Sequence, residues 1–309
     1  MEKVFSVLQV IVPIFAAVLL GMLARRKKLL STEQVSGLQQ FVMKFGLPCV
    51  LFNSCLGANI GSESLTTMCM LLPMILLSAL GGFWARKRFF HYHNLPMMFS
   101  AQESGMLGIP LFVTLFGAQQ AYRVGVMDMT QSLIAIPVLA ILAANVGENP
   151  TVGSIVKQVL RSPLLLMSLL GLVLNLSGAA ALLDSVGIGA VITESTGFFA
   201  QPVNALMLFS VGFNFSISKQ NRKPIFTLCA IHLVLFALFG AIMLGVMALL
   251  PEVDSLTRYA IVLYCVLPGS FITPTLGRTE EEITVTSGVS SILTLFSLLV
   301  FCGMAVVVA

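Results

Sequence analysis

Ten stretches of mostly apolar residues take up most of this chain and constrain its fold more than any other feature. A helix needs about 20 such residues to cross the hydrocarbon core of a bilayer. Only 10% of the residues are charged and 57% are hydrophobic, whereas a soluble domain has about 25% charged residues. The sequence therefore predicts an all-α integral membrane protein with ten transmembrane helices. The expected spans are residues 4–24, 33–56, 65–85, 95–116, 121–146, 155–177, 187–216, 224–250, 256–277 and 281–308.

Lysine and arginine fall mainly in alternate loops, with 13 on one side of the membrane and 3 on the other. The richest loops are 25–28, 86–88, 157–161 and 219–223. Basic loops of a membrane protein stay in the cytoplasm, so we expect a cell-membrane protein with both termini outside the cytoplasm. The net charge is +4, and the basic residues behind it lie mainly in these loops, where they set the topology. No nucleic-acid partner is therefore expected. Two spans are also expected to begin with capping boxes, Ser31 with Gln34 and Thr279 with Glu282.

Glycine and proline positions in the second half repeat those of the first half at offsets of 150 to 164 residues. Each half contains five expected spans, which is an odd number, so the second half must run inverted relative to the first. The pattern predicts two inverted five-helix repeats, residues 1–146 and 147–309, as in many secondary transporters. The matched pairs are Pro13 with Pro163, Gly21 with Gly171, Pro48 with Pro202, Gly105 with Gly269, Pro110 with Pro274 and Gly125 with Gly288.

The fourth and ninth spans contain glycine and proline at their centres, in "SGMLGIPLFV" (104–113) and "PGSFITPTLG" (268–277). Inside a helix, glycine costs about 1 kcal/mol and proline about 3 kcal/mol relative to alanine. Backbone groups freed by such a break need partners inside the bilayer. We expect helices 4 and 9 to be broken there and to cross near the bilayer centre, with half-helix N-termini that suit an anion. The alternative is that Pro110 and Pro274 only kink their helices.

Three segments resemble the auxin efflux carrier family: "FVMKFGLPCVLFN" (41–53), "SGMLGIPLFVTLFG" (104–117) and "VLPGSFITPTLG" (266–277). This family includes plant auxin exporters and bacterial carriers described as malonate or malate permeases. The resemblance implies a ten-helix inverted-repeat fold, like that of the bile-acid/sodium symporters, with scaffold and transport domains that each draw helices from both repeats. It also implies elevator-like alternating access for a carboxylate-bearing substrate, and a homodimer through the scaffold helices would suit it. This chain has Glu103 where we expect the family's asparagine.

Ionisable and amide side chains inside the spans are the candidate binding residues, because buried polar groups in a membrane are costly. Lys44 could anchor a substrate carboxylate, pair with Glu103 or extend to the interface. Glu103 could couple a proton or a sodium ion, or be a structural partner of Lys44. Asp128 could line a cavity or lie near the headgroups, and Asn53 and Asn204 could bind neighbouring helices or substrate. The full set is Lys44, Asn53, Gln102, Glu103, Ser104, Gly105, Gly108, Pro110, Asp128, Gln131, Asn204, Pro268, Gly269, Ser270, Thr273 and Pro274.

These patterns predict a secondary carrier for a small organic anion, with no cofactor other than a coupling Na⁺ or H⁺. An alternative is an uncoupled uniporter or exporter of auxin-like aromatic carboxylates. A membrane enzyme is disfavoured because the chain has no G-x-S-x-G or H-E-x-x-H motif. Neither a catalytic nor a metal-binding residue is expected. A sensor or channel on the same fold remains a further alternative.

Overall fold

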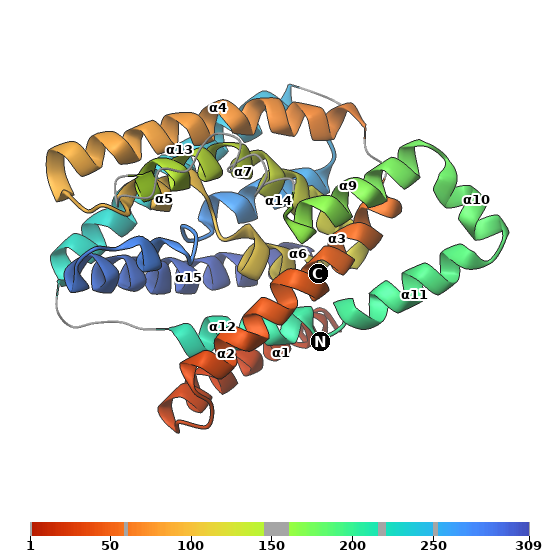
Figure 1. Ribbon diagram of the computed structural model, residues 1–309, viewed down its shortest axis with the longest axis horizontal. Coiled ribbons are helices and arrows are strands. Elements are labelled where there is room, and N and C mark those ends of the chain that lie inside the picture. Colours follow the sequence, from red (N-terminus) through yellow and green to blue (C-terminus); the bar gives the residue numbers. More distant parts are fainter. Residues whose placement is uncertain (1, 59–60, 145–160, 216–220, 250–252, 309) are drawn as a thin grey trace.

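The computed structural model describes residues 2–58, 61–144, 161–215, 221–249 and 253–308, and these residues form helices and connecting segments (Figure 1). Six of the described helical segments are long and apolar enough to cross a membrane. A seventh span results if Pro163–Leu176 and Ala179–Ser185, which are bent by 79° relative to each other, count as one. The all-helical, multi-pass prediction is therefore confirmed. The count of ten spans and the inversion of the halves stay predictions, and the connection expected between the spans 121–146 and 155–177 lies outside the described residues.

Figure 1 labels the elements in chain order. The segments η1, η2 and η3 are π-helical turns, and η4 and η5 are 3₁₀ turns. The bounds are α1 Glu2–Arg26, α2 Thr32–Phe41, η1 Val42–Gly46, α3 Leu47–Leu56, α4 Ser62–Ala85, η2 Arg86–Phe90, α5 Leu95–Ser100, η3 Ser104–Gly108, α6 Ile109–Phe116, η4 Ala118–Gln120, α7 Ala121–Ala144, α9 Pro163–Leu176, α10 Ala179–Ser185, α11 Ile188–Ala200, α12 Val203–Asn214, α13 Arg222–Ala248, α14 Ser255–Val266, η5 Thr273–Leu276 and α15 Glu280–Val308.

Local sequence signals explain where two of these helices begin. The Gln34 N–H donates to Ser31 Oγ at 3.2 Å and the Ser31 N–H donates to Gln34 Oε1 at 2.8 Å, so the predicted capping box of α2 is confirmed. At α15 only one half of the box forms, because the Glu282 N–H donates to Thr279 Oγ1 at 3.2 Å. The Glu282 carboxylate instead accepts the N–H of Arg278 at 2.9 Å, one residue earlier than predicted. Three glutamates in the first turn of α15 favour its N-terminus through the helix dipole.

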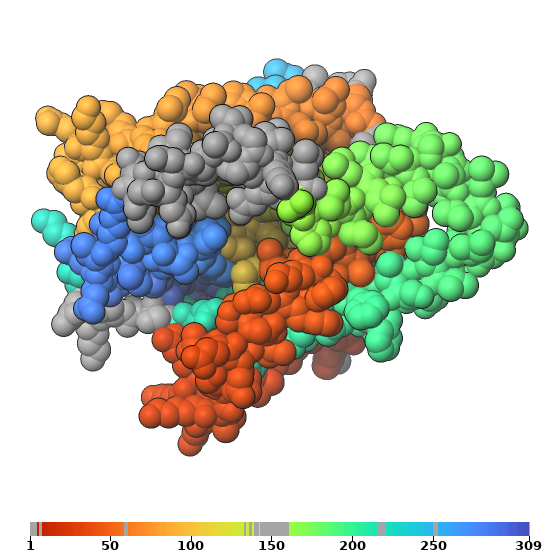
Figure 2. Space-filling view, viewed as in Figure 1, coloured from red at the N-terminus to blue at the C-terminus, as the bar shows by residue number. Residues whose placement is uncertain are grey.

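The helices pack in two groups. The first helix group contains α1, α2, α3 and α9 to α12, and the second helix group contains α4, α5, α7 and α13 to α15. In the space-filling view the red and green segments of the first group lie together on one side, with the orange and blue segments of the second group on the other (Figure 2). The groups meet where α3 contacts α7 and where α1 contacts α15, while α6 contacts helices of both groups.

Glycines allow close backbone contact inside the first helix group. A Cβ added to Gly212 would lie 1.9 Å from the carbonyl oxygen of Val18, and one added to Gly21 would lie 2.0 Å from that of Phe209. These contacts pack α1 against α12. Gly171 packs α9 against α3 in the same way, with an added Cβ 2.5 Å from the carbonyl oxygen of Phe52. Small residues are typical where membrane helices approach closely.

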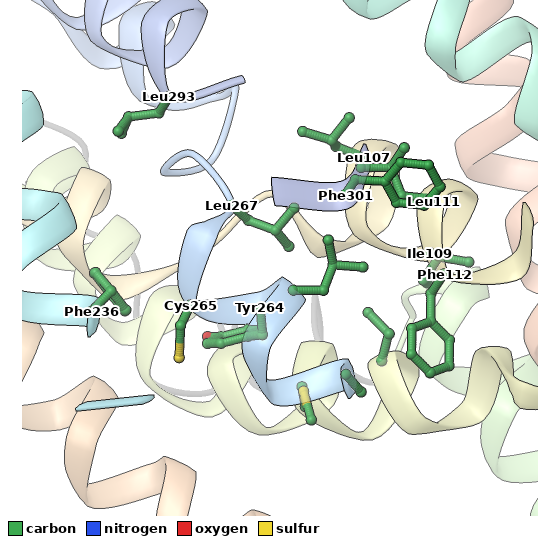
Figure 3. Close-up of a cluster of buried hydrophobic side chains, with 14 of the residues drawn as sticks. Leu107, Ile109, Leu111, Phe112, Phe236, Tyr264, Cys265, Leu267, Leu293 and Phe301 are labelled. Carbon is green, nitrogen blue, oxygen red and sulfur yellow. The ribbon is translucent and has the colours of Figure 1, made fainter. Parts of the chain in front are cut away.

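A buried apolar cluster includes side chains of the helix that begins at η3, and Figure 3 shows part of it. Side chains from η3 and α6 pack among side chains from α13, α14 and α15, so they are fixed by helices from distant parts of the sequence. In a bilayer such packing acts mainly through van der Waals contact. The labelled members are Leu107, Ile109, Leu111, Phe112, Phe236, Tyr264, Cys265, Leu267, Leu293 and Phe301.

Candidate functional site

Two interrupted segments, residues 101–104 and 267–271, meet through their backbones, and we call them the crossing segments. Gln102 and Gly269 form an antiparallel bridge. The Glu103 N–H donates to the Pro268 carbonyl at 2.8 Å, and the Ser270 N–H donates to the Ala101 carbonyl at 2.9 Å. The expected contact between the fourth and ninth spans is therefore present, and it satisfies the backbone groups that the interruptions free.

The interruptions differ from the prediction in two respects. The first lies at residues 101–103 rather than at Gly105 and Pro110, because 104–116 is a continuous helix that begins with the π turn η3. Pro110 is the second residue of α6, directly after this π turn, so it lies inside the continuous helix and not at a break. In the ninth span, Pro274 is the second residue of the four-residue 3₁₀ turn η5. The expected second half-helix is thus only one short turn, since the chain enters α15 shortly afterwards.

The carboxylate of Glu103 joins the two crossing segments. One of its oxygens accepts the Met106 N–H at 3.2 Å and the other accepts the Phe271 N–H at 2.6 Å. The side chain is 7% exposed. The N-terminus of the η3–α6 helix is therefore already capped by a carboxylate that belongs to the chain itself.

Gln131 of α7 connects a third helix to both crossing segments. Its Oε1 accepts the Gln102 N–H and the Tyr264 hydroxyl, each at 2.8 Å. Its Nε2 lies 2.9 Å from the Gln102 carbonyl and 2.7 Å from Ser104 Oγ. Ser104 in turn donates to Asp128 Oδ1 at 2.5 Å. This network fixes the crossing segments to α7 through side chains that are almost entirely buried.

The side chains of Gln102 and of His232 in α13 contact the backbone carbonyls of the second crossing segment. With its amide nitrogen turned toward the surrounding acceptors, Gln102 can donate to the carbonyls of Leu267 and Pro268 at 2.8 and 3.3 Å. His232 is fully buried, and its Nε2 lies 3.2 Å from the Leu267 carbonyl. Tyr264 and His232 were not among the candidate site residues. A tyrosine and a histidine in apolar spans carry no local signal of such a role.

A cavity of about 420 Å³ lies beside the crossing segments, between them and residues of α3, α7 and α9. We call it the crossover cavity. Its described lining includes two carboxylates but no lysine, arginine or histidine. Met43, Leu51 and Met97 contribute an apolar part. The polar lining residues are Gln102, Glu103, Asp128, Gln131, Ser132, Ser162, Ser168 and Ser270.

The structure gathers most of the predicted site residues at this place. Gly105 lines the cavity, whereas Gly108 packs against Leu267, whose side chain would lie 2.8 Å from an added Cβ. Thr273 is buried beyond the crossing, where its carbonyl accepts an N–H from Asn94 at 3.0 Å. The residues that line the cavity or form the crossing are Gln102, Glu103, Ser104, Gly105, Asp128, Gln131, Pro268, Gly269 and Ser270.

Three predicted residues lie elsewhere. Lys44 is exposed on η1 and lines a separate cavity of about 310 Å³ with Phe199 of α11. It forms no ion pair with Glu103 in the part of the chain that the structure describes, so the alternative in which these two residues pair is not seen here, and the two line separate cavities. Asn53 joins α3 to α11, where it accepts from Thr196 Oγ1 at 2.6 Å. Asn204 is half-buried in α12 and lines neither cavity.

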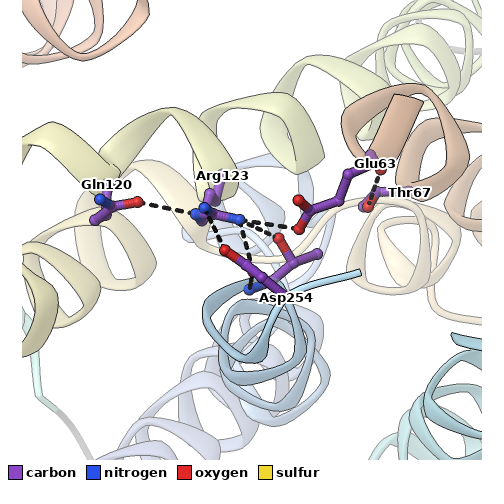
Figure 4. Close-up of polar contacts among 6 residues, drawn as sticks. Glu63, Thr67, Gln120, Arg123 and Asp254 are labelled. Carbon is purple, nitrogen blue, oxygen red and sulfur yellow. Dashed lines mark hydrogen bonds and ion pairs between the residues drawn. The ribbon is translucent and has the colours of Figure 1, made fainter. Parts of the chain in front are cut away.

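A polar cluster that the sequence did not predict lies around Arg123 at the start of α7 (Figure 4). The guanidinium contacts Glu63 of α4 at 2.9 Å and the N-cap residue of α14, Asp254, at 2.7 and 2.9 Å. It also hydrogen-bonds to Gln120 and Thr257. Burial tends to raise the pKa of Asp254, but the Thr257 N–H and the Arg123 charge outweigh it and hold that pKa below its usual value. The cluster ties three helices of the second helix group together.

Comparison with known proteins defines the class of this multi-pass helical protein as a membrane transporter. The chain is 24% identical to an uncharacterized transporter of Methanothermobacter thermautotrophicus over 243 residues, which cover 75% of this chain and 76% of the relative. Residues 6–302 match the model of the membrane transport protein family, and the chain belongs to that family. The resemblance to the auxin efflux carriers is thereby confirmed.

Proposed function

We propose that this protein is a secondary carrier that moves a small carboxylate-bearing solute across the cell membrane and binds it in the crossover cavity. The observation that carries the proposal is the cavity itself, which adjoins two interrupted segments paired through their backbones. Interrupted helices near the bilayer centre form the substrate sites of many transporters. The loop charges support an orientation with both termini outside the cytoplasm.

Transport by elevator-like alternating access is the mechanism we propose. The first helix group would be the scaffold and the second helix group would carry the cavity across the membrane. The glycine packing supports inverted repeats, because Gly21 packs α1 on α12 while its predicted counterpart Gly171 packs α9 on α3. Exposed apolar side chains on α1 and α11, such as Leu19 and Phe198, suit a homodimer through the scaffold.

Cotransport of a cation fits the charge of the crossover cavity. Glu103 and Asp128 both line it, and like charges in a shared site oppose one another. A carboxylate cargo would therefore enter together with H⁺ or Na⁺. The alternative is an uncoupled exporter of auxin-like aromatic carboxylates, which is supported by the apolar part of the lining formed by Met43, Leu51 and Met97.

Counterflow in liposomes tests this proposal. Purified protein would be reconstituted with unlabelled malate or indole-3-acetate inside, and entry of the labelled compound would be followed with H⁺ or Na⁺ gradients of either sign. We expect saturable counterflow with at least one compound. Glu103→Gln should change the H⁺ or Na⁺ dependence, because it removes one carboxylate from the cavity. Glu33→Gln, at an exposed position of α2, is the matched control. Entry that does not saturate with either compound would contradict a carboxylate carrier.

A further inference from the structure

We infer that the solute held in the crossover cavity carries an ammonium group, and that this group binds beside Asp128. The inference rests on the proposed function, because it takes the crossover cavity to be the transport site. It narrows the substrate class from carboxylates in general to amino-carboxylates, in which a positive group accompanies the negative one.

The charges that face the cavity carry the first step. Both ionisable side chains in its described lining, Glu103 and Asp128, are acids. Lys44 belongs to the lining of the other cavity. A dicarboxylate would bring two negative charges next to these two acids, and like charges brought together at an interface are unfavourable. An ammonium group would instead be attracted to a carboxylate there, and more strongly than in water because many of the lining residues are buried.

The hydrogen bonds carry the second step, because Asp128 and two serines of the lining still have acceptor sites that N–H donors of the cargo could use. Asp128 Oδ1 accepts from Ser104 and Gln131. Its Oδ2 receives no hydrogen bond from the residues that the structure describes. The hydroxyl groups of Ser132 and Ser168 donate their hydrogen bonds to backbone carbonyls, at 2.8 and 2.7 Å. What these groups still offer is acceptor lone pairs, and an ammonium supplies three N–H donors whereas a carboxylate supplies none.

Glu103 explains why the ammonium group is placed at Asp128. Both oxygens of Glu103 already accept backbone N–H groups, those of Met106 and Phe271. The N–H donors that could have received a substrate carboxylate at the start of η3 are thus occupied by the chain itself. Asp128 is the carboxylate in the lining with a free oxygen. The cavity volume of about 420 Å³ accommodates a short carbon chain beside this group.

Four probes with the same four-carbon chain test the contributions of the carboxylate and the ammonium group separately: succinate, butyrate, 4-aminobutyrate and n-butylamine. The measurement is the melting temperature of the purified full-length protein against probe concentration, since a ligand of the folded state raises it. We expect 4-aminobutyrate to raise it at concentrations at least tenfold lower than butyrate or succinate. Asp128→Asn should remove this preference, and Asp184→Asn, at an exposed position of α10, should retain it.

The other possible outcomes distinguish a failure of this inference from a failure of the proposed function. Stabilisation by succinate or butyrate without any by the amines would overturn the inference and leave the carboxylate carrier standing. Stabilisation by n-butylamine without any contribution from a carboxylate would keep the ammonium site beside Asp128 but overturn both the amino-carboxylate substrate and the proposed carboxylate carrier. If Na⁺ alone gives the Asp128-dependent shift and the amines add nothing, the carboxylate serves a coupling ion and the inference is wrong. It is equally wrong if neither amine shifts the wild-type protein, whose ligand-free melting temperature shows that it is folded.

Discussion

A single carboxylate, that of Glu103, binds the backbone N–H of Met106 in η3 and that of Phe271 in the second crossing segment, although Glu103 and Phe271 lie 168 positions apart. A carboxylate can do this because both of its oxygens are acceptors. An amide at the same position would have one oxygen and an NH₂ group, and the NH₂ group would face one of the two N–H donors. The departure from the asparagine that the family resemblance leads one to expect is therefore part of how this chain holds its crossing together.

Asp254 offers a prediction at the same scale. Asp254→Asn keeps a good N-cap for α14 but removes the charge that faces Arg123. The Asp254 side chain is 42% exposed, so we expect a loss of only about 0.5–1 kcal/mol in the free energy of unfolding at pH 7. The lowered pKa of Asp254 means that its stabilisation is fully present above the ordinary pKa of an aspartate, about 3.9, and is lost as the pH falls through the lowered pKa. Unfolding in detergent at pH 7 and pH 3 measures both effects.

Asp254→Ala is the companion variant. It removes the cap as well as the charge, and a lost cap costs about 1 kcal/mol more. Equal stability of the wild type and Asp254→Asn at pH 7 would contradict a role for the ion pair. A difference between them that does not become smaller from pH 7 to pH 3 would contradict a charge-dependent role of this carboxylate.

At the scale of elements, the contact of α1 with α12 depends on glycine at two positions. Gly212→Ala would place a methyl group 1.9 Å from the Val18 carbonyl oxygen, so one helix must move. Overpacking of this kind typically costs about 1–3 kcal/mol. We expect a lower melting temperature and a lower yield of folded protein in detergent. Gly245→Ala in α13, with open space around it, is the matched control and should be neutral or slightly stabilising. Similar losses in both variants would contradict a specific role for the close packing at Gly212.

The helical elements follow from local sequence, but the details of the crossing do not. Apolar length predicts the spans, and Ser31 with Gln34 predicts the start of α2. The interruption at residues 101–103 has the sequence Ala-Gln-Glu, which contains neither glycine nor proline. It exists because Ala101 and Glu103 pair with the backbone of Ser270 and Pro268, a contact between distant residues that no local pattern reveals. Pattern reasoning therefore found the right region but placed the break several residues too late.

Some side chains around the site could likewise be predicted from the sequence, whereas the positions of others depend on the tertiary fold. Gln131, Asp128 and Glu103 are polar residues inside apolar spans, and their chemistry made them visible. Which helix face Lys44 occupies depends on how η1 packs, and its depth along the span could not show that. Arg123 meets Glu63 and Asp254 from 60 and 131 positions away, so its cluster is a product of the tertiary fold.

At the scale of the whole molecule, the proposed elevator motion requires the two helix groups to slide past each other. Leu51 of α3 and Gly125 of α7 lie across their boundary, with an added Cβ on Gly125 2.7 Å from Leu51 Cδ2. In a variant without native cysteines, cross-linking Leu51→Cys to Gly125→Cys with mercuric ion should abolish counterflow, and thiol reductant should restore it.

The control pair lies inside the second helix group. Ile225 of α13 and Gly288 of α15 approach equally closely, with an added Cβ on Gly288 2.8 Å from Ile225 Cδ1. Cross-linking Ile225→Cys to Gly288→Cys should leave counterflow intact, because both helices would move together. Full counterflow in the cross-linked Leu51–Gly125 protein would exclude relative motion at this boundary.

The crossing segments are joined by main-chain atoms, through the Gln102–Gly269 bridge and the two hydrogen bonds beside it. Main-chain pairing leaves many of the neighbouring side chains free to change during evolution without undoing the junction. Related proteins could therefore change their substrate specificity through substitution of a few side chains, such as those of Asp128 or Ser270, while the backbone junction is retained.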